Sequence, residues 1–490
     1  MKIKINDLMQ QSGVKFGTSG ARGLAVEMTD AVCYAYTKGF LQYLEESGEL
    51  KKNGESVAIA GDLRPSTGRI MGAVAKAATD MGYEPVNCGR IPSPAVALYG
   101  IENVCPAIMV TGSHIPADRN GIKFNKCSGE ILKHDEEQIR EQIVEVDESI
   151  FGEEGFGLPE ENIDARINYV NRYTKTFPSD CLSGKKIGIY QHSAVGRDML
   201  IEIFSGLGAD VTPLGFSSEF VPVDTEAIRE EDVKLAREWS GENGFDAILS
   251  TDGDSDRPLI SDENGEWLRG DVACILAAKY LGADSASTPV SCNTALEKSG
   301  WFPDVRRTKI GSPFVVASMI EASFAGCKGV IGYEANGGFL TNSEFSVFGK
   351  DLRALPTRDA VLPVLAIILL SIQKRKSISA LLAELPQRFT ASDRIQDFPT
   401  EDSSKILDRF EEVSAIEEAF GDAFGKVEAI DRTDGLRVTF ESQEVLHMRP
   451  SGNAPEFRCY NEADSEERVQ EMQKISMDLL LKLKNSDPSA

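Results

Sequence analysis

Three carboxylates at alternate positions follow an apolar segment near the middle of the chain. Residues 245–250 read Phe-Asp-Ala-Ile-Leu-Ser, and Asp252, Asp254 and Asp256 come directly after them. Alternate residues of an extended chain point the same way, so these side chains can turn toward one point. Clustered carboxylates repel one another, whereas Mg²⁺ prefers such oxygen ligands. The spacing therefore predicts a magnesium site beside Arg257.

Three alternatives remain for this aspartate loop, residues 252–257. An EF-hand would use the three aspartates and Glu263, but Arg257 stands where that loop needs glycine, and the preceding segment is typical of a strand. A phosphatase with an aspartyl nucleophile also places alternate aspartates after a strand. The third alternative is an acidic turn held in solvent.

A second loop, residues 111–116, carries a candidate nucleophile. Ser113 and His114 follow the apolar residues 107–110, and Lys123 comes ten residues after the serine. A serine at a strand end beside potential bases can attack an electrophile. The chain lacks the G-x-S-x-G elbow of ordinary serine hydrolases. The alternative is a turn with a hydrogen-bonded histidine.

Two further loops carry polar groups suited to a sugar and to an anion. Glu334 and Asn336 lie in a glycine-rich loop after an apolar strand, and a carboxylate with an amide suits paired hydroxyls. Arginine, serine, a glycine-loosened backbone and asparagine form an anion cradle at Arg449, Ser451, Gly452 and Asn453. A simple turn, and an arginine held by a carboxylate, are the respective alternatives.

The elements that must position these loops alternate between strands and helices. Strands are predicted at 56–60, 85–87, 185–190, near 211, and at 245–250, 289–292 and 329–333, and helices at 66–81, from 197, at 225–240 and 313–322. Such alternation predicts an α/β fold with three similar mixed domains. Strands at 436–440 and 445–448 and a helix at 464–484, capped by Asp464, predict a C-terminal α+β domain.

The expected domains run over residues 1–165, 166–266, 267–385 and 386–490. Each contains one of the four loops, in the order serine, aspartate, Glu334 and Arg449.

Composition limits the partners. The 490 residues include 52 Lys and Arg against 77 Asp and Glu, a formal net charge of −25, which disfavours nucleic acid unless a basic stripe exists, and none is found. Nine cysteines without a C-x-x-C pair indicate reduced thiols. The apolar run at 360–370 is too short to span a bilayer, and the start has no signal peptide. We expect a cytoplasmic monomer or homodimer that binds neither membrane nor nucleic acid.

In order and combination, the four loops resemble the signatures of the α-D-phosphohexomutase superfamily. Residues 111–116 resemble its T-A-S-H-N-P motif, residues 252–257 D-G-D-G-D-R, residues 334–338 G-E-x-S-G, and residues 449–460 R-x-S-G-T-E-P-x-x-R-x-Y. Three supporting stretches agree, namely F-G-T-S-G-x-R-G at 16–23, G-x-D-x-R-x-S at 61–66 and N-G-x-K at 120–123.

This resemblance implies a four-domain enzyme with a central cleft. It also implies an isomerase that moves a phosphoryl group between the 1- and 6-positions of a hexose through a phosphoserine and a hexose 1,6-bisphosphate. Ser113 would carry the phosphoryl group and, with the three aspartates, hold Mg²⁺. His114, Lys123 and Arg22 would complete the catalytic set. The substrate would contact Arg257, Gly311, Ser312, Glu334, Asn336, Arg449, Ser451, Gly452, Asn453 and Arg458.

Departures from the family motifs bear on the sugar. Gly112, Ile115 and Ser255 replace alanine, asparagine and glycine in tolerable ways, whereas Asn336-Gly337-Gly338, Asn453-Ala454 and Ser312 differ at positions that face the sugar in relatives. Mannose phosphate is the favoured substrate, with glucose phosphate and then glucosamine phosphate as alternatives. A sugar-phosphate-binding protein without activity is the alternative of another class.

Overall fold

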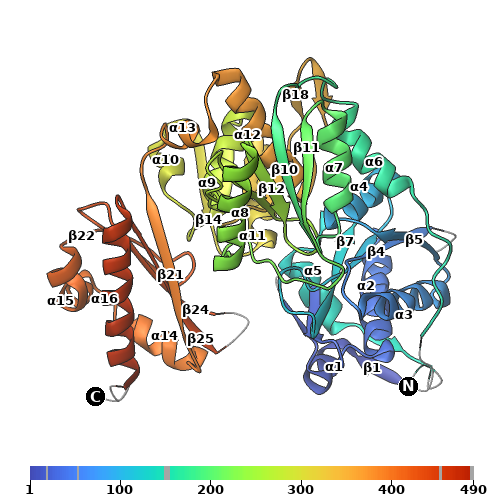
Figure 1. The fold of residues 1–490 in the computed structure, drawn as a ribbon. Helices are drawn as coiled ribbons and strands as arrows, with labels where there is room; N and C mark the ends of the chain where they lie inside the picture. The colour runs from blue at the N-terminus through green and yellow to red at the C-terminus, as the bar shows by residue number, and fades with distance from the viewer. Residues whose placement is uncertain (18–19, 52–54, 148–149, 151–154, 452–454, 486–490) are drawn as a thin grey trace. The chain divides into compact units, whose positions relative to one another are not determined.

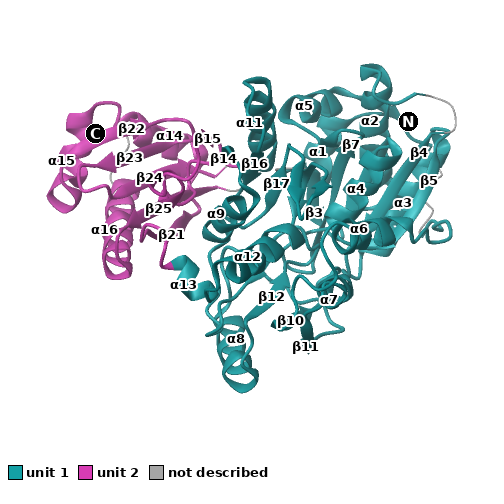
Figure 2. Cartoon of the chain, turned by 90° about the horizontal axis from the view of Figure 1, so that it is seen from above, with its two compact units in different colours: residues 1–287, 311–382 teal, residues 288–310, 383–490 magenta. Residues whose placement is uncertain are grey.

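The computed structural model describes residues 1–17, 20–51, 55–147, 150, 155–451 and 455–485. The chain divides into two compact units (Figure 2). Unit 1 contains residues 1–287 and 311–382, and unit 2 contains residues 288–310 and 383–490. Within the described residues, no helix combines the length and the apolar character needed to cross a membrane. All nine cysteines are free thiols.

The first sheet of unit 1 has the strand order β2-β3-β7-β6-β4-β5, with β8 against β7. Helices cover both faces of this sheet. On one face, Val57 and Ile59 belong to a hydrophobic core shared with α2 and α3, and on the other face Gly100 of α4 lies against Ala107. Figure 1 shows α2 and α3 beside β4. The elements are β2 (Lys15–Phe16), β3 (Gly20–Leu24), α2 (Asp30–Ser47), β4 (Ser56–Gly61), α3 (Thr67–Asp80), β5 (Glu84–Arg90), α4 (Ser93–Asn103), β6 (Ala107–Val110), β7 (Arg119–Lys126) and β8 (Gly129–Glu130).

A short pair of antiparallel strands and two helices adjoin this sheet. They are β1 (Lys2–Lys4), α1 (Ile5–Ser12), α5 (Lys133–Glu141) and β9 (Ile143–Glu145).

The second sheet has the order β11-β10-β12-β13, in which β10 runs parallel to β11 and β12, and β13 returns antiparallel to β12. Strand β12 is buried at every position, as expected for a strand covered on both faces. The elements are α6 (Asp164–Thr174), β10 (Lys186–His192), α7 (Arg197–Gly206), β11 (Asp210–Phe216), α8 (Glu230–Asn243), β12 (Ala247–Thr251) and β13 (Pro258–Ile260).

In the third sheet, β14 runs parallel to β16 through residues 285–287, and β17 and β20 continue it antiparallel. Val315 and Met319 of α11 form a small core with Val330 and Leu340 of this sheet. The elements are α9 (Gly270–Leu281), β14 (Ser285–Pro289), α11 (Ser312–Phe324), β16 (Val330–Tyr333), β17 (Phe339–Thr341), the hairpin β18 (Phe345–Val347) and β19 (Lys350–Leu352), β20 (Leu355–Asp359), α12 (Val361–Lys374) and α13 (Ile378–Leu382).

Unit 2 is built on an antiparallel sheet in the order β21-β25-β24-β23-β22. Leu436, Val438 and Phe440 of β23 alternate toward one core shared with three helices. The elements are α10 (Ala295–Lys298), β15 (Asp304–Thr308), β21 (Phe389–Gln396), α14 (Thr400–Asp408), α15 (Val413–Phe424), β22 (Val427–Asp431), β23 (Leu436–Phe440), β24 (Val445–Pro450), β25 (Glu456–Ala463) and α16 (Glu466–Asn485).

Residues 288–310 are tied to this sheet by polar contacts. The Glu462 carboxylate accepts a hydrogen bond from the Thr294 backbone N at 3.0 Å and pairs with Arg388 Nε at 2.6 Å. The Ile310 backbone N donates to Asp434 Oδ2 at 2.8 Å. A segment more than 70 residues upstream of the sheet therefore packs against it within the same unit.

The predicted α/β class is confirmed, and three local predictions are wrong. The strand expected at 289–292 is a turn after β14, and the helix expected from 225 begins at Glu230. The N-terminus of α16 is capped by the Ser465 hydroxyl, which accepts from the Arg468 backbone N at 3.2 Å, and not by Asp464. The four domain boundaries stay a prediction.

Candidate active site

The serine loop begins where β6 ends. Ser113 is fully buried and has φ of +56°, a left-handed conformation that is unfavourable for a residue with a side chain. Its backbone N donates to Thr111 Oγ1 at 2.7 Å, and this hydroxyl donates to Asp62 Oδ2 at 2.7 Å. The surrounding hydrogen bonds therefore hold the serine in a strained conformation, as is common at functional sites.

Arg64 braces this loop from behind. Its buried guanidinium donates to the carbonyl oxygens of Ser113, Ile115, Pro116 and Arg119 at 2.8, 2.5, 2.6 and 3.1 Å. It also pairs with Asp62 at 3.0 Å. A Cβ at Gly112 would lie 2.7 Å from Arg64 Cζ, so glycine at this position makes room for the brace.

We expect Arg64→Lys to lower kcat by about 10²-fold, because an ammonium group cannot reach four carbonyl oxygens and a misplacement of about 1 Å has this cost. Steady-state kinetics would measure the loss. Arg69→Lys is the matched control, since Arg69 braces the Met28 carbonyl at 2.8 Å within the same unit and away from the serine loop. Equal kcat for the two variants would contradict the bracing role.

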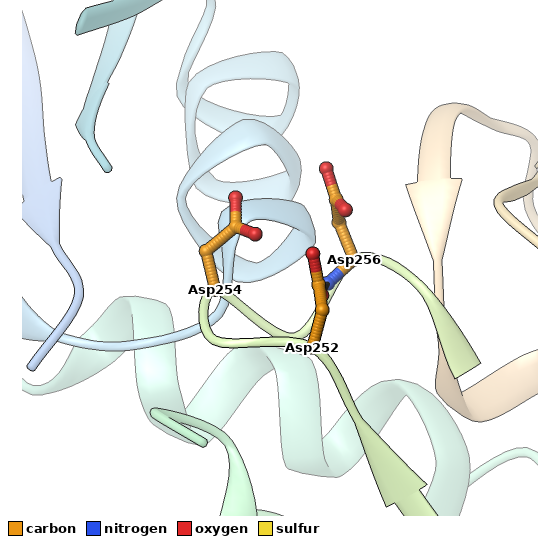
Figure 3. Close-up of side chains that lie close together, drawn as sticks. All are labelled: Asp252, Asp254 and Asp256. Carbon is orange, nitrogen blue, oxygen red and sulfur yellow. Dashed lines mark hydrogen bonds between the residues drawn. The ribbon is translucent and has the colours of Figure 1, made fainter. Parts of the chain in front are cut away.

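The aspartate loop connects β12 to β13. Figure 3 shows Asp252, Asp254 and Asp256 rising from one turn toward the same side. All three are at most 2% exposed, and one ligand atom from each lies within 4.8 Å of the others. Burial between two strands excludes both the solvated turn and the EF-hand. Ser255 has φ of +57°, and its hydroxyl accepts from the Gly196 backbone N at 2.9 Å.

The serine and aspartate loops meet. The Ser113 hydroxyl donates to Asp252 Oδ2 at 2.6 Å across 139 residues of sequence. Lys123 Nζ donates to Asp254 Oδ2 at 2.5 Å and to Asp256 Oδ2 at 2.6 Å, and the Ser93 hydroxyl donates to the same Asp254 oxygen at 2.6 Å. The structure thus brings together Ser113, Lys123 and the three aspartates.

The remaining oxygens fit a cation. Asp254 Oδ1 and Asp256 Oδ1 are buried and have no hydrogen-bond donor among the described residues. A buried carboxylate oxygen without a donor is costly, and a divalent cation would satisfy it. In Asp254 and Asp256, Oδ2 already accepts from Lys123, so Oδ1 is the atom available to a metal ion.

The electrostatics of the aspartate cluster also indicate that a cation is needed there. Burial, together with the charges of Asp254 and Asp256, raises the pKa of Asp252 well above its usual value. Burial also opposes ionisation of Asp254, but the ammonium of Lys123 and hydrogen bonds from Lys123 and Ser93 hold its pKa below the usual range. The charges of Arg257 and Lys123 lower the pKa of Asp252 only in part, and a further positive charge at this point would compensate its carboxylate.

His114 is a neutral imidazole here. Burial, followed by the charges of Arg257 and Arg22, lowers its pKa to about 2. Its Nδ1 accepts from Arg257 Nη1 at 2.8 Å and lies 3.5 Å from Ser113 Oγ. Burial and the nearby arginines Arg257 and Arg358 also lower the pKa of Arg22 to about 10. The site thus gathers several cations around the serine, as an anionic group there requires.

The Glu334 loop, residues 334–338, lies between β16 and β17. The Glu334 carboxylate pairs with Arg358 Nη1 at 3.3 Å. Asn336 Oδ1 accepts from the Gly338 backbone N at 2.9 Å, so this side chain shapes the turn. After Gly311, which has φ of +133°, the buried Ser312 hydroxyl donates to Glu130 Oε2 at 2.7 Å.

In unit 2, Arg449 and Arg458 are paired across β24 and β25. Arg449 Nε lies 3.3 Å from Asp434 Oδ1, which agrees with the alternative of an arginine held by a carboxylate. Arg458 Nη2 lies 3.2 Å from Glu456 Oε2, and the Ser451 backbone N donates to the Glu456 carbonyl at 2.8 Å. Gly452 and Asn453 lie outside the described residues.

Sequence reasoning missed three residues of the site. Ser93, Glu130 and Arg358 contact Asp254, Ser312 and Asp256 from positions more than 100 residues away in sequence. None of them lies in a recognisable motif. Arg64 could have been identified as a site residue from the sequence, because it lies within the motif at 61–66.

Comparison with known families identifies four consecutive domains. The models described as phosphoglucomutase/phosphomannomutase α/β/α domains I, II and III match residues 13–149, 167–265 and 269–389. The model of the C-terminal domain of the same family matches residues 398–478.

Individual relatives agree. A phosphomannomutase from Salmonella muenchen is 46% identical over 468 residues, which cover 94% of each chain. A phosphomannomutase from Sinorhizobium fredii is 42% identical over 94% of this chain and 97% of its own. A phosphoglucosamine mutase from Clostridium botulinum is 27% identical over 93% of this chain and 96% of its own.

Solved structures share the fold. A phosphoglucomutase/phosphomannomutase family protein from Burkholderia thailandensis aligns with a TM-score of 0.73 at 19% identity, over 96% of this chain and 97% of that chain. A putative phosphomannomutase from Thermus thermophilus aligns with a TM-score of 0.72 at 20% identity, over 95% and 99%. Four matching domains in order and relatives of nearly equal length lead to one conclusion: the chain belongs to the phosphoglucomutase/phosphomannomutase family.

Proposed function

We propose that the protein is a phosphomannomutase, which interconverts mannose 1-phosphate and mannose 6-phosphate through a phosphoserine at Ser113. The observation that carries the proposal is the 2.6 Å hydrogen bond from the Ser113 hydroxyl to Asp252 of the buried aspartate cluster. Relatives at 46% and 42% identity named phosphomannomutase support mannose as the sugar. Glucose phosphate, and then glucosamine phosphate, are the alternative substrates.

Asp252, Asp254 and Asp256, together with the phosphorylated Ser113, would hold Mg²⁺. The buried Oδ1 atoms of Asp254 and Asp256, which have no hydrogen-bond donor among the described residues, support this assignment. When bound, the cation neutralises charge on the phosphoryl group during its transfer.

The nearby cations complete the catalytic set. Arg22, Lys123 and Arg257 stabilise negative charge on the phosphoryl group of Ser113. Lys123 and His114 are the candidate general acid and base; with Nδ1 of His114 engaged by Arg257, its Nε2 is the atom left to exchange a proton.

The substrate is bound through groups other than the hydroxyl that reacts. Glu334 accepts hydrogen bonds from sugar hydroxyls, on a loop that Asn336 shapes, beside Gly311 and Ser312. In unit 2, Arg449, Ser451, Gly452, Asn453 and Arg458 bind the phosphate that does not react.

The reaction then consists of two transfers. The phosphoryl group of Ser113 passes to the free hydroxyl of the hexose monophosphate; this hydroxyl loses its proton, and the serine oxygen gains one as its bond to phosphorus breaks. The hexose 1,6-bisphosphate turns around, and its other phosphoryl group returns to the serine oxygen; the serine hydroxyl loses its proton, and the sugar oxygen that is released gains one. The nine free thiols support a reducing compartment, the cytoplasm, for this enzyme.

The direct test is incubation of the purified protein with mannose 1-phosphate, Mg²⁺ and a trace of hexose 1,6-bisphosphate. We expect mannose 6-phosphate, measured by a coupled assay, and kcat/KM higher for mannose than for glucose or glucosamine phosphate. The three sugars are compared in parallel with the same preparation.

Other products would identify the alternatives. Release of inorganic phosphate at the rate of substrate loss would indicate the phosphatase. Binding without any product would indicate the non-catalytic protein. A higher kcat/KM for glucose 1-phosphate would keep the mutase and reject mannose as the preferred sugar.

A further inference from the structure

Arg358 connects three acidic segments of unit 1. It lies on β20, is 2% exposed, and its guanidinium faces carboxylates from three separate parts of the chain. Nε lies 3.1 Å from Asp256 Oδ2, Nη1 lies 3.3 Å from Glu334 Oε2, and Nη2 lies 3.8 Å from Glu130 Oε1. One planar group therefore contacts both the aspartate loop and the Glu334 loop.

The strand that carries Arg358 is anchored on its opposite face. Neighbouring residues of a strand point to opposite faces, and Asp359 accordingly turns away from Arg358. Its carboxylate accepts from the Tyr169 hydroxyl at 2.7 Å, from the Tyr173 hydroxyl, and from the Val361 backbone N at 3.0 Å. The backbone beneath Arg358 is thus fixed independently of the site.

Glu130 is fixed as well. Its carboxylate accepts from the Ser312 hydroxyl at 2.7 Å and from the Thr357 hydroxyl at 2.9 Å. The space between Lys123, Asp256, Glu130 and Arg358 is a cavity of about 10 Å³, room for about one water molecule. The guanidinium consequently has little freedom to take another position.

The ion pair with Arg358 is formed by one oxygen of Asp256. Lys123 donates to Oδ2, and Arg358 Nε lies 3.1 Å from the same oxygen, whereas Oδ1 has no hydrogen-bond donor among the described residues and lies 3.8 Å from Arg257 Nε. The Arg358 guanidinium also fixes Glu334, whose carboxylate we assigned to the sugar hydroxyls. Although burial opposes its charge, the carboxylates of Asp256, Glu130 and Glu334 raise the pKa of Arg358, so it stays a cation.

We propose that Arg358 is a positioning residue that couples the aspartate loop to the Glu334 loop, so that the cation ligand Asp256 and the sugar-binding Glu334 are held at one fixed separation. The sugar half of this proposal rests on the proposed function, whereas the effect on Asp256 does not. A lysine cannot replace Arg358, because one ammonium lacks the fork that reaches two carboxylates at once.

The test uses Arg358→Lys and Arg358→Met in the full-length protein. Mn²⁺ binding is followed by electron paramagnetic resonance without substrate, and kcat and KM are measured separately. We expect both variants to bind Mn²⁺ about 10- to 100-fold more weakly and to lose kcat by a similar factor, as removal of groups that orient metal ligands does. Arg229→Met is the matched control and should keep both values, since Arg229 pairs with the buried Asp232 at 2.7 Å away from the site.

A double variant separates positioning from charge balance. If Arg358 only neutralises buried carboxylates, Arg358→Met combined with Glu130→Gln restores Mn²⁺ affinity and kcat, and the proposal is wrong. Positioning predicts no recovery. Arg358→Lys keeps the charge, so unchanged Mn²⁺ affinity in this folded variant would also overturn the proposal. Absence of mutase activity in the unsubstituted protein would reject the proposed function, while weaker Mn²⁺ binding in the variants would still support the coupling to Asp256.

Discussion

Ser113→Ala is expected to abolish the phosphoenzyme and to lower kcat by at least about 10³-fold, because it removes the hydroxyl that would receive the phosphoryl group from the bisphosphate. The Ser113 hydroxyl reaches Asp252 of the aspartate cluster at 2.6 Å, in a backbone conformation that only a braced loop can maintain. Intact-protein mass spectrometry after incubation with hexose 1,6-bisphosphate measures the phosphoenzyme, and a coupled assay measures kcat.

Ser128→Ala is the matched control for this experiment. Ser128 is exposed between β7 and β8, so the same change there should leave the added phosphoryl mass and kcat unaltered. If Ser113→Ala still gained the phosphoryl mass, or turned over at the normal rate, the nucleophile would have to lie elsewhere.

Asp252→Asn is expected to change activity and stability in opposite directions. Removing the carboxylate takes away a proposed cation ligand and should lower kcat by about 10²- to 10³-fold. In the presence of a chelator, however, the same change relieves a buried charge that burial and its two neighbours disfavour. We therefore expect the melting temperature of the metal-free protein to rise by about 2–4 °C.

The loss of kcat is measured by steady-state kinetics with Mg²⁺ titration, and the rise in melting temperature is measured by thermal melts with and without chelator. Asp246→Asn is the control, because Asp246 pairs with Lys185 at 2.8 Å in the same sheet and lies outside the cluster. A lower melting temperature for Asp252→Asn in chelator, together with an unchanged Mg²⁺ requirement, would show that the aspartates do not form a cation site.

Local pattern predicted those parts of the site that lie within one loop. Ser113 and the three aspartates each follow an apolar strand, so their types and positions are readable from the chain. The contact between them is not readable from the chain, because β6 and β12 belong to different sheets. Arg358 is not readable in this way. Its contacts depend on how β20 pairs with β17 and on where Asp256 and Glu334 arrive in space, which are properties of the assembled unit.

Two predicted element boundaries are wrong, at places where a side-chain contact or a turn opposes the hydrophobic pattern of the sequence. The expected helix from 225 starts later because Thr225 donates its hydroxyl to the Asn336 carbonyl at 2.7 Å, which holds this segment against the Glu334 loop. Arg229 then pairs with Asp232 in the first turn of α8. At 289–292, proline and valine suggested a strand, whereas β14 ends at Pro289 and the chain turns there. In both places a tertiary contact or a turn overrides the hydrophobic pattern.

The packing of residues 288–310 makes the C-terminal unit discontinuous along the gene. The Glu462 carboxylate takes its hydrogen bond from Thr294, and Asp434 takes one from Ile310, although both donors are encoded before residue 311. A fragment excised from residue 383 onward would carry a buried carboxylate severed from its upstream donor, and the complementary fragment would keep the donors of Thr294 and Ile310 without their acceptors. This unit therefore cannot be exchanged between relatives as one uninterrupted cassette, and a chimera must carry residues 288–310 along with it.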